Sequence, residues 1–143
     1  MSDVLTIGMV GCGGMMGVHK NGFEALWNAG IRNFRIVACC DVDVERAQHM
    51  AASVEAFQGV RPAVYQHVED MLSEEPEMAA VDISTVHREH HTVAIPCFEA
   101  GKHVTIEKPL AITMRAGKLM LDAAEKAGVR FQVAENYRRS PEQ

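Results

Sequence analysis

Residues 7–19 read IGMVGCGGMMGVH, an apolar run that breaks into glycines and ends on a histidine. Gly11 and Gly13 follow a strand-like segment and precede a helical pattern, which is the setting of the dinucleotide-binding fingerprint. In that fingerprint the second glycine lets a pyrophosphate approach the backbone amides at the start of a helix. The third glycine should fall at residue 16, which is Met16, so the loop alone is a weak signal. A plain strand-to-helix turn is the alternative.

Strand-like runs alternate with helical patterns along the rest of the chain. We expect strands at residues 4–10, 34–40, 81–85, 103–107 and 130–135, and a weaker one at 63–66. Helical patterns cover residues 18–29, 44–54, about 88–100 and about 114–127. The strands are almost continuously apolar, as in a parallel sheet covered on both faces. The alternation predicts an α/β fold with a doubly wound parallel sheet.

Helix-end signals support these boundaries. Asp43 and Thr113 stand where a side-chain oxygen caps the first turn of a helix. Gly101 and Gly128 follow the third and fourth helical patterns, as glycines at helix C-termini do.

Composition limits the possible partners. The chain has 143 residues, 48% of them hydrophobic and 23% charged, which fits one globular domain. The net charge of −5 and the scattered Lys and Arg residues argue against a nucleic-acid partner. We find no signal peptide and no run approaching the roughly 20 apolar residues of a membrane span, and so expect no membrane partner and a cytoplasmic location. Four cysteines without a C-x-x-C motif indicate reduced thiols and no zinc site.

Asp41 strengthens the dinucleotide hypothesis. It ends the strand at 34–40, where an acidic residue can hydrogen-bond an adenosine ribose. A carboxylate would repel a 2′-phosphate, and Val42 supplies no positive charge, so we predict NAD rather than NADP. Capping of the next helix is the alternative role of Asp41, but Asp43 already serves that purpose.

Polar residues follow other strand ends. Glu107 and Lys108 come after the strand at 103–107, where a Lys can hold a substrate hydroxyl or carry its proton. A solvated pair before the turn at Pro109 is equally compatible with their position. His87 and His91 have the i, i+4 spacing of metal ligands, but no carboxylate or Cys completes a set, so we predict no metal.

The segment AENYRRSP at 134–141 places Asn136 and Arg138 after the last strand. They are either polar groups at the same sheet edge or part of an exposed exit segment.

Five motifs together resemble the N-terminal domain of the family that includes glucose–fructose oxidoreductase, myo-inositol dehydrogenase and the rhizopine-catabolism proteins. In chain order they are GCGGMMGVH, CDVDVERA, DISTVHREHH, AGKHVTIEKPLAIT and ENYRRSP, and AGKHVTIEKP is the most specific. The resemblance covers essentially the whole chain. It implies a Rossmann-type sheet with strand order 3-2-1-4-5-6 and oxidation or reduction of sugars or polyols through a nicotinamide cofactor.

The resemblance also implies roles for individual residues. Lys108 is the expected catalytic residue, which handles the proton of the substrate hydroxyl. His19 takes the family's position, expected in the first helical turn. The expected cofactor-binding residues are Gly11, Cys12, Gly13, Gly14, Met15, Met16, His19, Asp41, Val42, Arg46, Thr85, Val86, His87, His90, Glu107, Lys108, Asn136 and Arg138.

Residues 1–136 are therefore expected to form a dinucleotide-binding domain, and 137–143 to begin the crossover to a second α/β domain that this chain lacks. Family members supply further catalytic groups and their subunit interface from that domain, so we expect the full-length form to be a homo-oligomer and this chain alone to be inactive. The alternative function is a non-catalytic dinucleotide-binding module that senses redox state or joins another subunit. A flavodoxin-like nucleotide binder would explain the loop but not Asp41.

Overall fold

The computed structural model describes residues 4–135 and contains a six-stranded parallel sheet. Its order is β3-β2-β1-β4-β5-β6, which confirms the predicted order 3-2-1-4-5-6. The central strands β1 and β4 lie side by side where the strand order reverses, so a crevice is expected beyond their carboxyl ends. The strands are β1 (Leu5–Val10), β2 (Phe34–Cys40), β3 (Ala63–Tyr65), β4 (Ala80–Ile83), β5 (His103–Glu107) and β6 (Phe131–Ala134).

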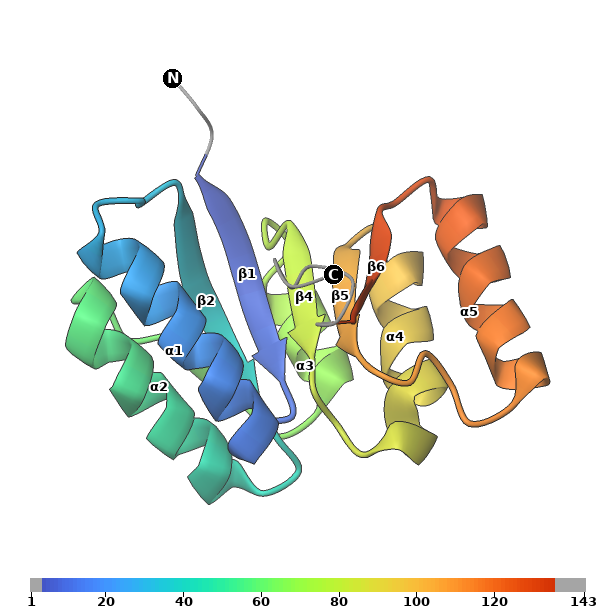
Figure 1. The fold of residues 1–143 in the computed structure, drawn as a ribbon, viewed down its shortest axis with the longest axis horizontal. Coiled ribbons are helices and arrows are strands. Elements are labelled where there is room, and N and C mark those ends of the chain that lie inside the picture. The colour runs from blue at the N-terminus through green and yellow to red at the C-terminus, as the bar shows by residue number, and fades with distance from the viewer. Residues whose placement is uncertain (1–3, 136–143) are drawn as a thin grey trace, which may run out of the picture.

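Helices cover both faces of the sheet. Figure 1 shows α1 and α2 over the half formed by β1 and β2, with α3, α4 and α5 on the opposite face. Three differences from the sequence prediction appear: α1 begins at Gly14 and not at residue 18, α3 was missed, and the third predicted helix starts as a separate 3-10 turn. The helices are α1 (Gly14–Asn28), α2 (Val44–Gln58), α3 (Val68–Glu74), the 3-10 turn η1 (His87–Glu89), α4 (His90–Glu99) and α5 (Met114–Ala127).

Strand alternation divides the interior into two cores. Met9 packs with Met16 of α1 and Met50 of α2, whereas the next residue, Val10, belongs to the core that contains Met71 of α3 and Phe98 of α4. Successive side chains of a strand point to opposite faces, so burial on both faces requires an apolar residue at almost every position. This explains the continuous apolar runs in the sequence.

The predicted helix ends are confirmed. The Asp43 carboxylate accepts a hydrogen bond from Glu45 N at 3.2 Å, and the Thr113 hydroxyl accepts one from Ala116 N at 3.1 Å. Such caps contribute about 1 kcal/mol each to stability. Gly128 ends α5 in the left-handed conformation, with φ of 67°.

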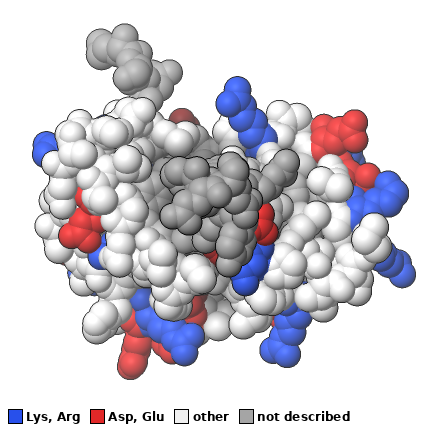
Figure 2. Space-filling model, in the orientation of Figure 1, with Lys and Arg blue, Asp and Glu red and all other residues white. Residues whose placement is uncertain are grey.

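The distribution of charged side chains and the character of the helices bear on the partners predicted from the sequence. Figure 2 shows Lys and Arg side chains dispersed among Asp and Glu over the described part of the visible face. Within residues 4–135, no helix combines the length and the apolar character needed to cross a membrane.

Gly11 allows the ends of β1 and β4 to approach each other closely. Its φ of 84° lies in the left-handed region, and a β-carbon there would sit 2.7 Å from the carbonyl carbon and oxygen of Ser84. Both conditions exclude any residue with a side chain. Gly13 differs, since its φ is −82° and a β-carbon there would meet no atom within 4 Å.

We therefore expect Gly11→Ala to lower the free energy of unfolding by about 2–4 kcal/mol, because left-handed strain and backbone overlap add. Gly13→Ala is the matched control and should change it by less than about 0.5 kcal/mol. Urea denaturation of both variants measures the difference. Equal stabilities would contradict the close approach at Gly11.

Candidate functional site

The glycine loop presents free backbone donors at the carboxyl edge of the sheet. It joins β1 to α1, and the first turn of α1 begins with the hydrogen bond from Gly17 N to Gly13 O at 3.1 Å. The amides that precede Gly17 in this turn have no acceptor within the helix, and Gly13 has no side chain that could cap them. Together with the open space beside Gly13, this arrangement fits an anionic group such as a pyrophosphate.

Asp41 fastens the loop to the sheet. This buried residue, 8% exposed, accepts a hydrogen bond from Cys12 N to Oδ2 at 2.7 Å and another from Asp43 N to Oδ1 at 2.9 Å. Each carboxylate oxygen can accept more than one hydrogen bond, so ribose hydroxyls remain possible partners. Sequence reasoning predicted the ribose contact and missed the fastening role.

Cys12 uses its polar groups within the protein. Its amide donates to Asp41, and its thiol donates to the Cys40 carbonyl at 3.5 Å. Contact with the Cys39 thiol and burial raise the pKa of Cys12 above its usual range, so the thiol stays neutral. Of the loop residues, Gly13 and Gly14 are thus the ones with amides available to a ligand.

A hollow of about 530 Å³ opens beside this loop, between α1 and α2. It adds positive charge that the motif analysis only partly predicted: Arg46 was expected and Lys20 was not. Lys20 pairs with Glu24 at 2.8 Å, and Arg46 pairs with Asp43 at 3.3 Å. The lining residues are Cys12, Gly13, Gly14, Gly17, Lys20, Arg46, His49, Met50 and Ser53.

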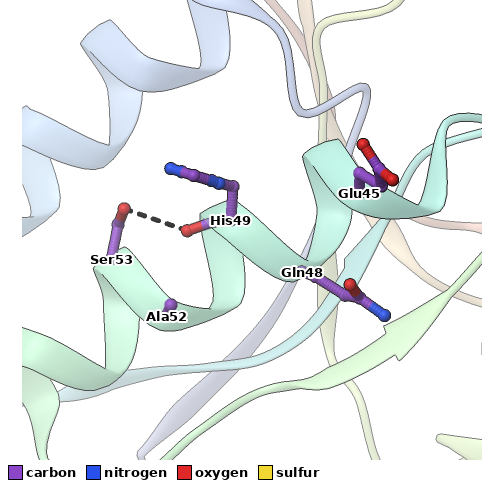
Figure 3. A pocket seen from close by; sticks show the side chains of 5 residues that line it. All are labelled: Glu45, Gln48, His49, Ala52 and Ser53. Carbon is purple, nitrogen blue, oxygen red and sulfur yellow. Dashed lines mark hydrogen bonds between the residues drawn. The ribbon is translucent and has the colours of Figure 1, made fainter.

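A second hollow of about 570 Å³ runs along α2 and shares His49 and Ser53 with the first. Figure 3 shows that all five lining side chains come from this one helix, with the Ser53 hydroxyl bonded to the His49 carbonyl. The other three are Glu45, Gln48 and Ala52. No strand end contributes to it, so it lacks the residues that the motifs single out.

His19 bridges two buried carboxylates. Its Nδ1 lies 2.8 Å from Asp82 Oδ2 on β4, and its Nε2 lies 2.8 Å from Glu107 Oε1 at the end of β5. An ionised carboxylate only accepts hydrogen bonds, so an imidazole bonded to two of them donates from both nitrogens and is positively charged. Hydrogen bonding to Asp82 outweighs burial and, with the contribution of Glu107, raises the pKa of His19 to about 9.

This placement corrects one expectation, because His19 lies in the second turn of α1, which starts at Gly14, and not in the first. Both ring nitrogens are occupied, so its predicted cofactor contact remains a prediction that would use other atoms of the ring. Asp82 was missed. A charged residue inside the apolar run VDIST was the available signal.

The backbone around Lys108 is held on both sides. Lys108 N donates to Glu107 Oε2 at 3.0 Å, and His90 Nδ1 donates to the Pro109 carbonyl at 2.9 Å. Lys108 itself is exposed at the carboxyl edge of β5, whereas Glu107 and His90 are buried. The structure therefore presents the Lys108 side chain to solvent on a fixed backbone.

Two residues near this edge that were predicted to contact the cofactor have polar atoms without a hydrogen bond. Thr85 Oγ1 and His90 Nε2 are buried and have no hydrogen-bond partner within the described residues. Buried polar atoms are normally paired, and an absent ligand is one reason for an exception. Both atoms fit a cofactor that binds beyond the ends of β4 and β5.

The remaining predicted residues divide by exposure. The Met16 side chain is fully buried in the core between the sheet and α1, so only its backbone could touch a cofactor. Asn136 and Arg138 lie outside the described residues. The exposed ones are Met15, Val42, Arg46, Val86 and His87.

Comparison with known proteins identifies the family. A family model described as "Oxidoreductase family, NAD-binding Rossmann fold" matches residues 5–135. Levoglucosan dehydrogenase of Pseudarthrobacter phenanthrenivorans is 32% identical over 96% of this chain and 34% of its own. Inositol 2-dehydrogenase 2 of Saccharopolyspora erythraea is 33% identical over 87% of this chain and 34% of its own. The chain thus spans about a third of the length of these curated relatives.

Solved structures show the same fold. The WlbA dehydrogenase of Bordetella pertussis, in complex with NADH and UDP-GlcNAcA, superposes with a TM-score of 0.76. The two sequences are 31% identical, and the match covers 97% of this chain and 39% of the other.

The charge on His19 predicts a pH-dependent stability. Its pKa is raised from 6.5 to about 9 in the folded state, so its contribution is complete below pH 6.5 and disappears as the pH rises through 9. We expect the free energy of unfolding to fall by up to about 3 kcal/mol across this range. Urea denaturation at several pH values measures it, and His19→Phe should show a smaller decline. Parallel pH profiles for the two proteins would contradict the bridge.

Proposed function

The chain belongs to the oxidoreductase family with an NAD-binding Rossmann fold, and from this premise we propose that it binds NAD across the glycine loop as the cofactor domain of a sugar or polyol dehydrogenase. The observation that carries the proposal is the loop itself. Its free amides, the space beside Gly13 and the ordered carboxylate of Asp41 stand at one edge of the sheet.

In the proposed complex the pyrophosphate lies on the amides of Gly13 and Gly14, at the positive end of α1. Asp41 accepts hydrogen bonds from the adenosine ribose while it holds the loop. The nicotinamide end reaches the ends of β4 and β5, where Thr85 and His90 offer their unpaired atoms.

Charge favours NAD over NADP. A 2′-phosphate would approach the Asp41 carboxylate, and neighbouring Val42 offers no compensating charge. Arg46 lies close by, but its guanidinium pairs with Asp43.

Bound NAD supplies a hydride acceptor, and the protein positions the reactants and handles the proton. The neutral Lys108 amine would receive the proton of the substrate hydroxyl as hydride leaves the carbinol carbon, and the resulting ammonium would return the proton in the reverse direction. Its fixed backbone at the carboxyl edge of β5 suits this role. We propose residues 1–136 as the cofactor domain.

The substrate class follows from the relatives, which are named as dehydrogenases of levoglucosan and inositol. We propose a small polyhydroxylated substrate and, for the full-length protein, a homo-oligomer in the cytoplasm. This chain alone should bind the cofactor without efficient turnover.

Calorimetric titration tests cofactor binding. The chain should bind NAD. Its affinity for NADP should be at least about tenfold lower, because the 2′-phosphate of NADP and the Asp41 carboxylate repel each other. Gly13→Ala should weaken NAD binding by at least about tenfold, since a methyl group keeps the pyrophosphate from the amides, yet leave stability unchanged. Preference for NADP would overturn the role of Asp41. A lack of binding to either cofactor would overturn the proposal.

Lys108→Met in the full-length protein tests proton handling. We expect kcat to fall by about 10²–10⁴-fold with a much smaller change in the Kd for NAD, because a proton-transfer group is lost while the glycine loop and Asp41 remain. Steady-state kinetics and calorimetry measure the two constants. Unchanged turnover would remove Lys108 from the chemistry.

A further inference from the structure

Hydrogen bonds that involve two histidines hold the backbone on both sides of Lys108. On one side its amide donates to Glu107 Oε2, and the other oxygen of Glu107 bonds His19 Nε2. On the other side His90 donates to the Pro109 carbonyl. The position of the lysine backbone therefore depends on side chains from helices on opposite faces of the sheet.

His19 connects this turn to the glycine loop. It belongs to α1, whose first turn presents the free amides, and its second nitrogen is fixed by Asp82 of β4. One imidazole thus ties α1, β4 and β5 together through two contacts of 2.8 Å. Rigid contacts of this kind keep a reactive group within the narrow tolerance that chemistry requires.

Neutralisation of buried charge is the simpler role for His19. The Asp82 and Glu107 side chains are 8% and 7% exposed, and two unpaired carboxylates so close together would be costly. Charge neutralisation alone does not require that one oxygen of Glu107 bonds His19 and the other accepts a hydrogen bond from the Lys108 amide. Because of these two hydrogen bonds, His19 orients the Glu107 carboxylate, and the carboxylate in turn holds the Lys108 amide.

We propose that His19 is a positioning residue which, through Glu107, fixes the backbone of Lys108 and links it to the helix that begins at the glycine loop. The inference rests on the proposed role of Lys108. In this role His19 acts through Glu107 and not directly on the reacting atoms.

The Lys108 amide is the direct readout, in NMR spectra of this chain without cofactor. In His19→Phe, which keeps a ring but no donor, we expect its proton to shift upfield and to exchange at least about tenfold faster. Asp82→Asn is the matched control, because His19 still bonds Glu107, and there the exchange rate should stay within about twofold.

Conservative replacement of Glu107 separates geometry from charge. Glu107→Gln can accept from Lys108 N and donate to a neutral imidazole, so the amide should stay protected, whereas Glu107→Leu should release it. Should His19→Phe fail to fold, the wild-type chain gives the same answer. The carbon shifts of Glu107 Cδ and Lys108 Cα should then follow the titration of the His19 ring.

An unchanged Lys108 amide in folded His19→Phe, or Lys108 shifts that ignore the His19 titration, would overturn the inference. These readouts need no cofactor. A chain that keeps the linked signals but binds no NAD would contradict the proposed function and leave this inference standing. Normal NAD binding with unlinked signals would contradict this inference alone.

Discussion

The Asp41 carboxylate is the constraint on which the site depends. Its two oxygens accept hydrogen bonds from the backbone amides of Cys12, in the turn after β1, and Asp43, in the turn after β2. Two neighbouring turns are thereby locked together at the carboxyl edge of the sheet. The Cys12 amide is thus satisfied within the protein, whereas the first amides of α1 have no acceptor within the helix. In the proposed complex the same buried carboxylate that orders the loop also selects between the riboses of NAD and NADP.

Charge is arranged differently on the other side of β1. There the Asp82 and Glu107 side chains share a protonated His19. Desolvation of the two carboxylates and the imidazolium offsets part of their attraction, and the raised pKa of His19 shows that a net attraction remains. The arrangement is understandable as a device for order, because it fixes the strand end next to the exposed Lys108.

Local signals in the sequence predicted much of this structure. The helix ends at Asp43, Thr113 and Gly128 depend on residue types with a narrow conformational meaning, and they were confirmed. The strand order, which the family resemblance implied, was confirmed as well. The helix α3 was missed because seven residues show too little periodicity. Asp82 was missed because its partner His19 lies 63 residues away, a separation that spacing does not reveal. Lys20 was missed for a similar reason, since the hollow that it lines is formed only where α1 packs beside α2.

The most direct test of the central claim is to map the backbone amides that respond to NAD by NMR. The account predicts that the largest shifts fall on Gly13, Gly14 and Met15, with smaller ones at Asp41 and Thr85. NADP at the same concentration should move the same signals less. Shifts that centre on the outer face of α2, or none at all, would contradict the claim that the glycine loop holds the cofactor.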